Sequence, residues 1–147
     1  MEGQQPIFVP PHAGRVLASP GVTHLLTGAE TGGAYYLFEV LFAAESGNRL
    51  HVHRRETEVG YVLEGALEIR LAERTTIVEV GGVAHLPKNV PHALRNPLTT
   101  PSRCLFMAIP AGLEHWFDAL AAARKAGGLD ESLSCRLSQD FGLEWLE

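Results

Sequence analysis

"RLHVHRRETEVGYVLEG", residues 49–65, places His51 and His53 two residues apart, followed by Glu58 and then by Glu64-Gly65. Side chains alternate across a β-strand, so two histidines at this spacing point to the same face. The charged run at residues 54–56 predicts a bend or bulge, which shifts the register and turns Glu58 toward the histidines. Glu64-Gly65 predicts a two-residue hairpin turn. The stretch therefore predicts a strand that directs several metal-ligand atoms toward one point.

A series of short β-rich runs extends from residue 33 to residue 109. Turn residues separate these runs, and no helical pattern lies between them; the runs cover residues 34–44, 49–53, 58–63, 66–71, 75–80, 83–86, 92–96 and 104–109. Strands that recur every 8–12 residues or so, with such turns, are typical of an all-β sandwich or barrel.

The two ends of the chain differ from this middle part. Residues 1–32 are rich in proline and glycine, which predicts an arm with short strands rather than helix. Residues 33–110 form the predicted barrel core. Residues 111–147 form a predicted helical tail packed on the same domain, because apolar residues 113, 116, 117, 120 and 121 share one helix face. That face either packs on the outside of the sheet or forms a lid or dimer surface. Asp130 is the expected N-cap of a second short helix.

The bulk composition excludes several classes of protein. A chain of 147 residues with 46% hydrophobic residues is about one globular domain. A net charge of −5 argues against nucleic-acid and anionic-membrane partners, since both require a basic face. The start of the chain has no secretory pattern, and Cys104 and Cys135 have no metal or disulfide spacing. We therefore expect a cytoplasmic protein with two reduced thiols.

His92 is a further candidate ligand. It follows residues 87–91, "PKNVP", a rigid turn in which Asn89 tolerates positive φ better than most residues. This turn delivers His92 to the start of a strand. Three imidazoles and a carboxylate suit one divalent transition metal ion, with iron, manganese, nickel, copper and zinc all admissible.

The spacing of these residues resembles the cupin superfamily. His-x-His, glutamate and glycine in the order of the first cupin motif fall at His51, His53, Glu58 and Gly65. The second motif falls at Gly81, Pro87, His92 and Asn96. Two positions depart from the pattern, because Glu45 and Asn89 stand where the family has glycine. The resemblance covers roughly residues 33–110, and the helical tail looks like that of small single-domain cupins loosely compared with quercetin dioxygenases.

The resemblance implies a jelly-roll barrel of six to eight strands (a double-stranded β-helix) with short C-terminal helices. It implies that His51, His53, Glu58 and His92 bind one metal ion inside the barrel, and that the protein is a homodimer. The leading hypothesis is a dioxygenase-type oxygenase acting on a small aromatic or enolic compound, with Glu58 both ligand and catalytic proton acceptor. Two alternatives remain: an isomerase, epimerase or lyase acting through an enolate, and a non-catalytic cupin that binds a small ligand.

The remaining histidines have weaker interpretations. His85 is either a surface residue or a group behind the metal ligands, and the surface interpretation is favoured. His12, His24 and His115 have no partners at ligand spacing and are interpreted as incidental. Asn96 is expected to fix a turn rather than to touch a substrate.

Overall fold

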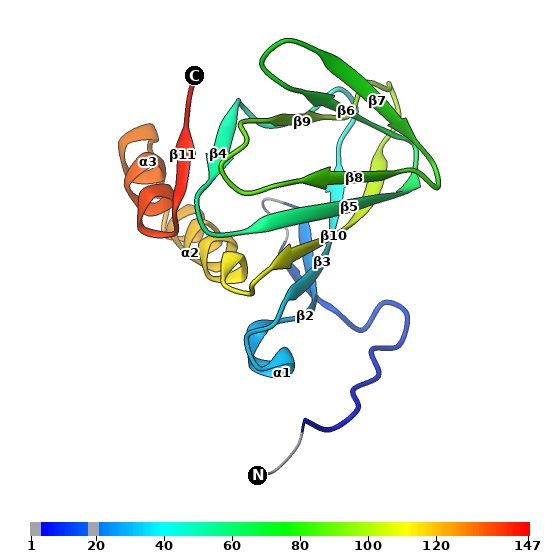
Figure 1. The fold of residues 1–147 in the computed structure, drawn as a ribbon. Helices are drawn as coiled ribbons and strands as arrows, with labels where there is room; N and C mark the ends of the chain where they lie inside the picture. Colours follow the sequence, from blue (N-terminus) through cyan, green and yellow to red (C-terminus); the bar gives the residue numbers. More distant parts are fainter. Residues whose placement is uncertain (1–3, 18–20) are drawn as a thin grey trace.

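The structure is a computed structural model that describes residues 4–17 and 21–147, and most of its elements are strands (Figure 1). The strands are β1 (Arg15–Leu17), β2 (Val22–Leu26), β3 (Tyr36–Phe42), β4 (His51–His53), β5 (Thr57–Glu64), β6 (Ala66–Arg70), β7 (Thr75–Glu79), β8 (Val83–Leu86), β9 (Ala93–Arg95), β10 (Ser102–Ile109) and β11 (Leu143–Trp145). The helices are α1 (Gly28–Thr31), α2 (Leu113–Lys125) and α3 (Glu131–Asp140). The expected β fold with C-terminal helices is confirmed.

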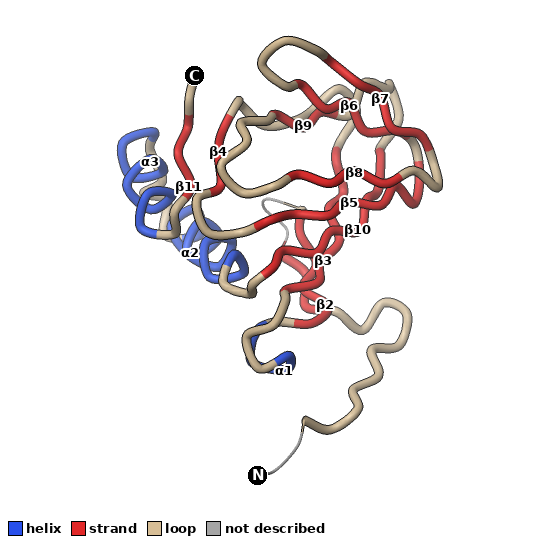
Figure 2. The backbone as a smooth tube through the Cα atoms, in the orientation of Figure 1, coloured by secondary structure: helices blue, strands red, loops and turns tan. Residues whose placement is uncertain are grey.

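The strands form two facing layers (Figure 2). One layer is a six-stranded antiparallel sheet in the order β1-β2-β3-β10-β5-β8. The other layer contains the sheet β7-β6-β9 and the pair β11-β4. A β-bridge between His51 and His92 connects this pair to that sheet. The eight strands from β3 to β10 lie within the predicted core.

The apolar core lies between these layers. Alternate residues of β10 are buried, so Cys104, Phe106 and Ala108 face inward as the period of a strand requires. The Phe106 ring lies 5.7 Å from that of Phe38 on β3, and Phe38 stacks on Tyr36 at 4.3 Å. The aromatic face of β3 is therefore central to the core.

Both positions that depart from the glycine pattern have left-handed backbone. Glu45 has φ 57° and Asn89 has φ 68°, values that favour glycine because other side chains crowd the backbone there. Asn89 N also donates to the carbonyl of His53 at 2.8 Å, which ties this turn to β4. The backbone geometry that the motif glycines would supply is thus present without them.

Asn96 fixes the backbone, as expected. It is fully buried, and its Nδ2 donates to the carbonyls of Phe42, Ala43 and Thr100 at 3.3, 3.1 and 2.7 Å. Its Oδ1 accepts from Leu98 N and Ser102 Oγ. This one amide therefore joins the ends of β3, β9 and β10.

Two local predictions are wrong. Glu64-Gly65 does not close a hairpin, because β5 pairs with β10 and β8 while β6 pairs with β7 and β9. Gly65, with φ 76°, instead lets the chain cross from one sheet to the other. Residues 1–32 also contain α1, which the sequence interpretation missed. Glu30 accepts from Thr27 N at 2.7 Å at its start, and Gly32 ends it with φ 63°.

The two C-terminal helices pack against one side of the β layers (Figure 1). Leu113, Trp116 and Leu120 of α2 are buried, so the apolar face packs inward and the interpretation as an exposed dimer surface is wrong. Asp130 caps α3 as predicted, accepting from Leu133 N at 2.7 Å. Within the described residues, none of the helices has the length and apolarity that crossing a bilayer requires.

Candidate metal site

β4 holds the first two histidines between two strand partners. On one side it pairs with β11, where Trp145 lies opposite His51 and Leu143 opposite His53. On the other side His51 and His92 exchange two backbone hydrogen bonds of 3.0 and 2.9 Å. Directly paired residues project side chains to the same face, so this exchange sets the imidazole of His92 beside that of His51. The local pairing explains how residues 41 positions apart share one site.

The three imidazoles of His51, His53 and His92 converge. Their ring centroids are 5.0, 4.6 and 5.7 Å apart, and one ligand atom from each lies within 4.8 Å of the others. All three residues are at most 4% exposed. The buried cluster could therefore hold a metal ion.

The second nitrogen of each ring faces an acceptor. Nδ1 of His51 lies 2.8 Å from the carbonyl of Arg49, and Nδ1 of His92 lies 3.1 Å from that of Val90. Nδ1 of His53 lies 3.7 Å from Glu56 Oε2, an ion-pair distance. The carbonyl acceptors at Nδ1 of His51 and His92 fix the proton there and leave Nε2 with its lone pair, which is the usual arrangement of metal-binding histidines.

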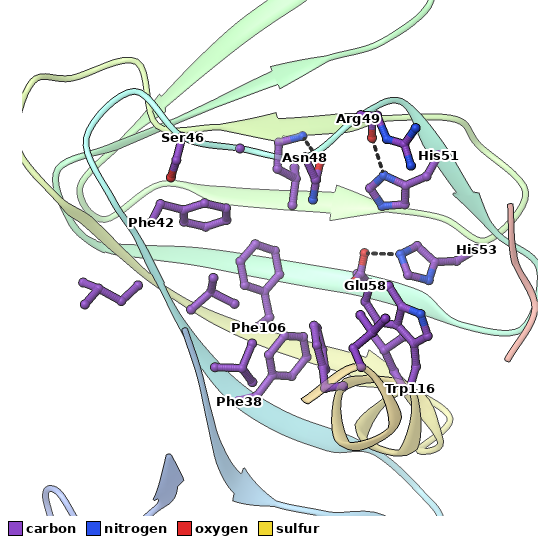
Figure 3. A pocket seen from close by; sticks show the side chains of 18 of the residues that line it. Phe38, Phe42, Ser46, Asn48, Arg49, His51, His53, Glu58, Phe106 and Trp116 are labelled. Atoms are coloured by element: carbon purple, nitrogen blue, oxygen red, sulfur yellow. Dashed lines mark hydrogen bonds and ion pairs between the residues drawn. The ribbon is translucent and has the colours of Figure 1, made fainter. Parts of the chain in front are cut away.

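Glu58 lies beside the histidines as the sequence predicts (Figure 3). Its Oε2 is 3.3 Å from His53 Nε2 and 3.4 Å from His92 Nε2. The bend after β4 lets β5 begin at Thr57, which places Glu58 among the buried residues of that strand. The structure thus brings all four predicted ligand residues together.

The protonation states of His51 and Glu58 suit a cation. Burial lowers the pKa of His53, but Glu58 and then Glu56 outweigh it, so that pKa is raised. Burial, followed by His53 and His92, lowers the pKa of His51 to about 4. Burial alone would raise the pKa of the Glu58 carboxyl, but the histidines, His53 first, outweigh it and hold that pKa at about 2. A neutral imidazole and an ionised carboxylate are the forms that bind metal ions.

Unpartnered polar atoms support the same interpretation. Among the described residues, the buried side-chain N and O atoms without a hydrogen-bond partner are His53 Nδ1, Glu56 Oε2, Glu58 Oε2 and His92 Nε2. Buried polar groups without a partner are rare in folded proteins and commonly mark an ion or water. Glu58 Oε2 and His92 Nε2 are ligand atoms of the proposed site, while His53 Nδ1 and Glu56 Oε2 face each other at 3.7 Å behind it. The donor set of imidazole and carboxylate fits a divalent transition ion.

A cavity of about 400 Å³ opens beside the cluster, a size typical of small-molecule sites. Figure 3 shows His51, His53 and Glu58 at one end and a row of aromatic side chains, among them Phe38, Phe42 and Phe106, along it. α2 also contributes to the lining, with Trp116, Phe117 and Leu120. The helix face that the sequence left ambiguous therefore packs inward and also lines the cavity.

Sequence reasoning missed two residues of the site. Glu56 is only 3% exposed, and its position three residues after His53 was a signal that its charged neighbours concealed. Trp145 lies with its ring 5.3 Å from that of His51, but no local pattern links residues so far apart in sequence. His85 is exposed, as the surface interpretation expected.

Comparisons with known proteins agree with this geometry. Residues 38–108 match the family model for the cupin domain (Cupin_2). No curated protein matches the chain.

Solved structures share the fold at low identity. An RmlC-like cupin from Shewanella frigidimarina superimposes with a TM-score of 0.61 at 16% identity, over 76% of this chain and 97% of its own. KdgF from Halomonas sp. superimposes with a TM-score of 0.57 at 20% identity, over 67% of this chain and 86% of its own. A predicted oxalate decarboxylase from Thermotoga maritima superimposes with a TM-score of 0.56 at 23% identity, over 60% of this chain and 78% of its own. Similarity at these identities establishes the fold alone.

Proposed function

The chain belongs to the cupin superfamily, and from that premise we propose that it is a metal-dependent oxygenase of the dioxygenase type. Its substrate is a small organic compound, aromatic or enolic. The observation that carries the proposal is the position of the buried histidine and glutamate cluster at one end of an aromatic-lined cavity. An ion there faces the same space that a small ligand would fill.

In this proposal Nε2 of His51, His53 and His92 and the carboxylate of Glu58 hold one divalent ion, which is iron, manganese, nickel, copper or zinc. Such an ion, when bound, supplies Lewis acidity, and all but zinc also supply redox chemistry with dioxygen. The carbonyls of Arg49 and Val90 and the carboxylate of Glu56 orient the rings through Nδ1.

Glu58 has a second role in the proposal. Its Oε2 has no hydrogen-bond partner among the described residues, and the side chain lines the cavity. A carboxylate in this position can accept a proton from a substrate hydroxyl or an acidic C–H group that enters the cavity. The aromatic walls orient the substrate and exclude water from the same space.

We further propose a cytoplasmic homodimer with no nucleic-acid or membrane partner. Exposed apolar residues on β5, β7 and β8, namely Tyr61, Ile77 and Val83, support a self-association surface. Light scattering of the purified protein tests the dimer directly.

Oxygen consumption tests the activity. The protein loaded with iron, manganese, nickel or copper is mixed with a panel of small phenols and enols in an oxygen electrode. We expect oxygen uptake with at least one compound, and a loss of about 10²–10⁴-fold in rate in Glu58→Gln. Glu73→Gln, in the exposed turn after β6, is the matched control and should keep the wild-type rate.

Other outcomes assign the alternatives. Turnover without oxygen uptake would overturn the oxygenase and favour an isomerase, epimerase or lyase. Ligand binding that Glu58→Gln leaves unchanged, with no turnover in the panel, would favour the non-catalytic cupin.

A further inference from the structure

The charge of the cavity lining differs from that of the whole chain. The protein carries a net charge of −5, whereas the charged residues that line the cavity are Arg49, Arg124 and Glu58. Glu58 belongs to the histidine cluster, so the two arginines are the charges that face the rest of the cavity. A divalent ion would add further positive charge. An acidic protein therefore surrounds a cavity that attracts anions.

Arg49 is held in place at the edge of the histidine cluster (Figure 3). Its guanidinium carbon lies 4.9 Å from the centroid of the Trp145 ring, a cation–π distance. Trp145 is itself fixed, because its Nε1 donates to Ser138 Oγ at 3.1 Å. The backbone carbonyl of Arg49 accepts from the His51 ring at 2.8 Å. The residue that presents the positive charge thus also touches the candidate metal site.

The ion pair that Arg49 makes leaves donors for a ligand. Its Nη1 donates to Glu131 Oε1 at 3.1 Å, and the Glu131 side chain is 79% exposed. Guanidinium has five N–H donors, and exposed ion pairs contribute only about 0–1 kcal/mol. A carboxylate in the cavity can therefore bind Arg49, whose side chain is 44% exposed, alongside or in place of Glu131.

Arg124 approaches the cavity from another element. It lies in the last turn of α2, one helical turn beyond Leu120, which lines the same cavity. Much of the remaining cavity lining is apolar, with Phe38, Phe42 and Phe106. A cavity that presents positive charge on its arginines and aromatic surface on its phenylalanines is complementary to an amphiphilic anion.

We propose that the substrate carries a carboxylate, which Arg49 and Arg124 bind while its apolar or aromatic body lies against the phenylalanines. This inference rests on the proposed function and specifies the substrate class of that same cavity. The carboxylate end of the substrate then lies beside the histidine cluster that Arg49 adjoins, and its body extends along the phenylalanines.

Binding of paired probes tests the inference. Benzoate, phenylacetate and 3-phenylpropionate are titrated calorimetrically into the Zn²⁺-loaded protein and compared with the three corresponding amides. We expect at least one carboxylate to bind more tightly than its amide. In that case Arg49→Gln and Arg124→Gln each weaken carboxylate binding by up to about fivefold, the factor for an ion pair at an exposed arginine. Arg74→Gln, in the exposed turn before β7, is the matched control and should bind as wild type.

Three results would overturn it: no carboxylate binds, the amides bind as tightly as the acids, or both arginine variants bind the acids like wild type. The last result would place the carboxylate on the ion alone. Zinc content is measured in every sample, and each titration is repeated on chelator-treated protein. A chain that binds no zinc but still prefers carboxylates through its arginines would refute the metal site and leave the substrate class standing.

Discussion

The buried histidine His24 and the buried histidine cluster around His51 are built in opposite ways. His24 is 3% exposed; its Nδ1 lies 2.6 Å from Tyr36 Oη and its Nε2 lies 3.2 Å from Asp118 Oδ1, so both ring nitrogens have partners. The cluster around His51, by contrast, contains the four unpartnered buried atoms found among the described residues. A buried polar group that serves the fold is paired within the chain, whereas one that binds a ligand keeps a lone pair available.

This contrast corrects the interpretation of His24 as incidental. Asp118 also accepts two hydrogen bonds from Arg15, so one network joins β1, β2, β3 and α2. Removing His24 should then lower the free energy of unfolding and leave metal binding intact. Removing His51 should abolish most metal binding and leave the free energy of unfolding largely unchanged.

The largest expected effect is the loss of metal on removal of a ligand. His51→Ala and His92→Ala should each lose most of the metal that the wild type retains through dialysis, because each removes one imidazole from a cluster of three. Elemental analysis of protein prepared without a histidine tag measures it. His85→Ala, which changes an exposed histidine, should keep the full content. Equal metal content in His51→Ala and the wild type would remove the distinction between the histidine cluster and His24.

The next effect concerns the acceptor behind His53. Glu56→Gln removes the carboxylate near Nδ1 and should lower metal affinity about 10–100-fold, the usual cost of losing such a partner. Competition with a fluorescent chelator gives the affinity. Glu114→Gln is the matched buried control, because Glu114 is 3% exposed but accepts from Gly28 N and Gly112 N rather than facing an imidazole of the cluster. Unchanged affinity in Glu56→Gln would show that His53 is oriented by packing alone.

A smaller effect is expected at His24. His24→Ala leaves Tyr36 Oη and one Asp118 contact without the ring, which should lower the free energy of unfolding by about 1–3 kcal/mol. Urea denaturation measures the change. The exposed His115 offers the control, since His115→Ala should stay within about 0.5 kcal/mol of the wild type. A His24→Ala protein that loses metal rather than stability would contradict the assignment.

The smallest effect is a pH dependence of stability. Burial, followed by Arg15, lowers the pKa of His24 below its usual 6.5, although Asp118 partly opposes this. The folded state then binds the proton more weakly than the unfolded chain, so stability falls as pH drops below about 6.5. The loss ends once the pH is below the folded-state pKa. Comparing the denaturation midpoints of wild type and His24→Gln between about pH 5 and 8 isolates the contribution of His24. Midpoints that change equally with pH in the two proteins would contradict this prediction.

The sequence was sufficient where the information is local. The spacing of His51, His53 and Glu58 predicted a shared site because strand period and one bend determine where neighbouring side chains point. The turn at Asn89 was predicted because its φ follows from residue type and flanking prolines. These features depend on few residues close in sequence.

The sequence was insufficient where partners come from far along the chain. The Gly65 error arose because a turn signal says nothing about which sheet each strand joins. The pairing of β4 with β11 and the contact of Asp118 with His24 join residues that are 90 to 94 positions apart in sequence. Such contacts are set by packing of the whole fold, and no local pattern reports them.

The pairing of β4 with β11 also limits how the site could be moved to another protein. A peptide of residues 49–65 would keep two of the three imidazoles and Glu58 but lose His92, Trp145 and the strands that position them. Transplanting the first motif alone into a new scaffold should therefore yield a weak and poorly ordered chelator. The smallest portable unit of this chemistry is close to the entire domain.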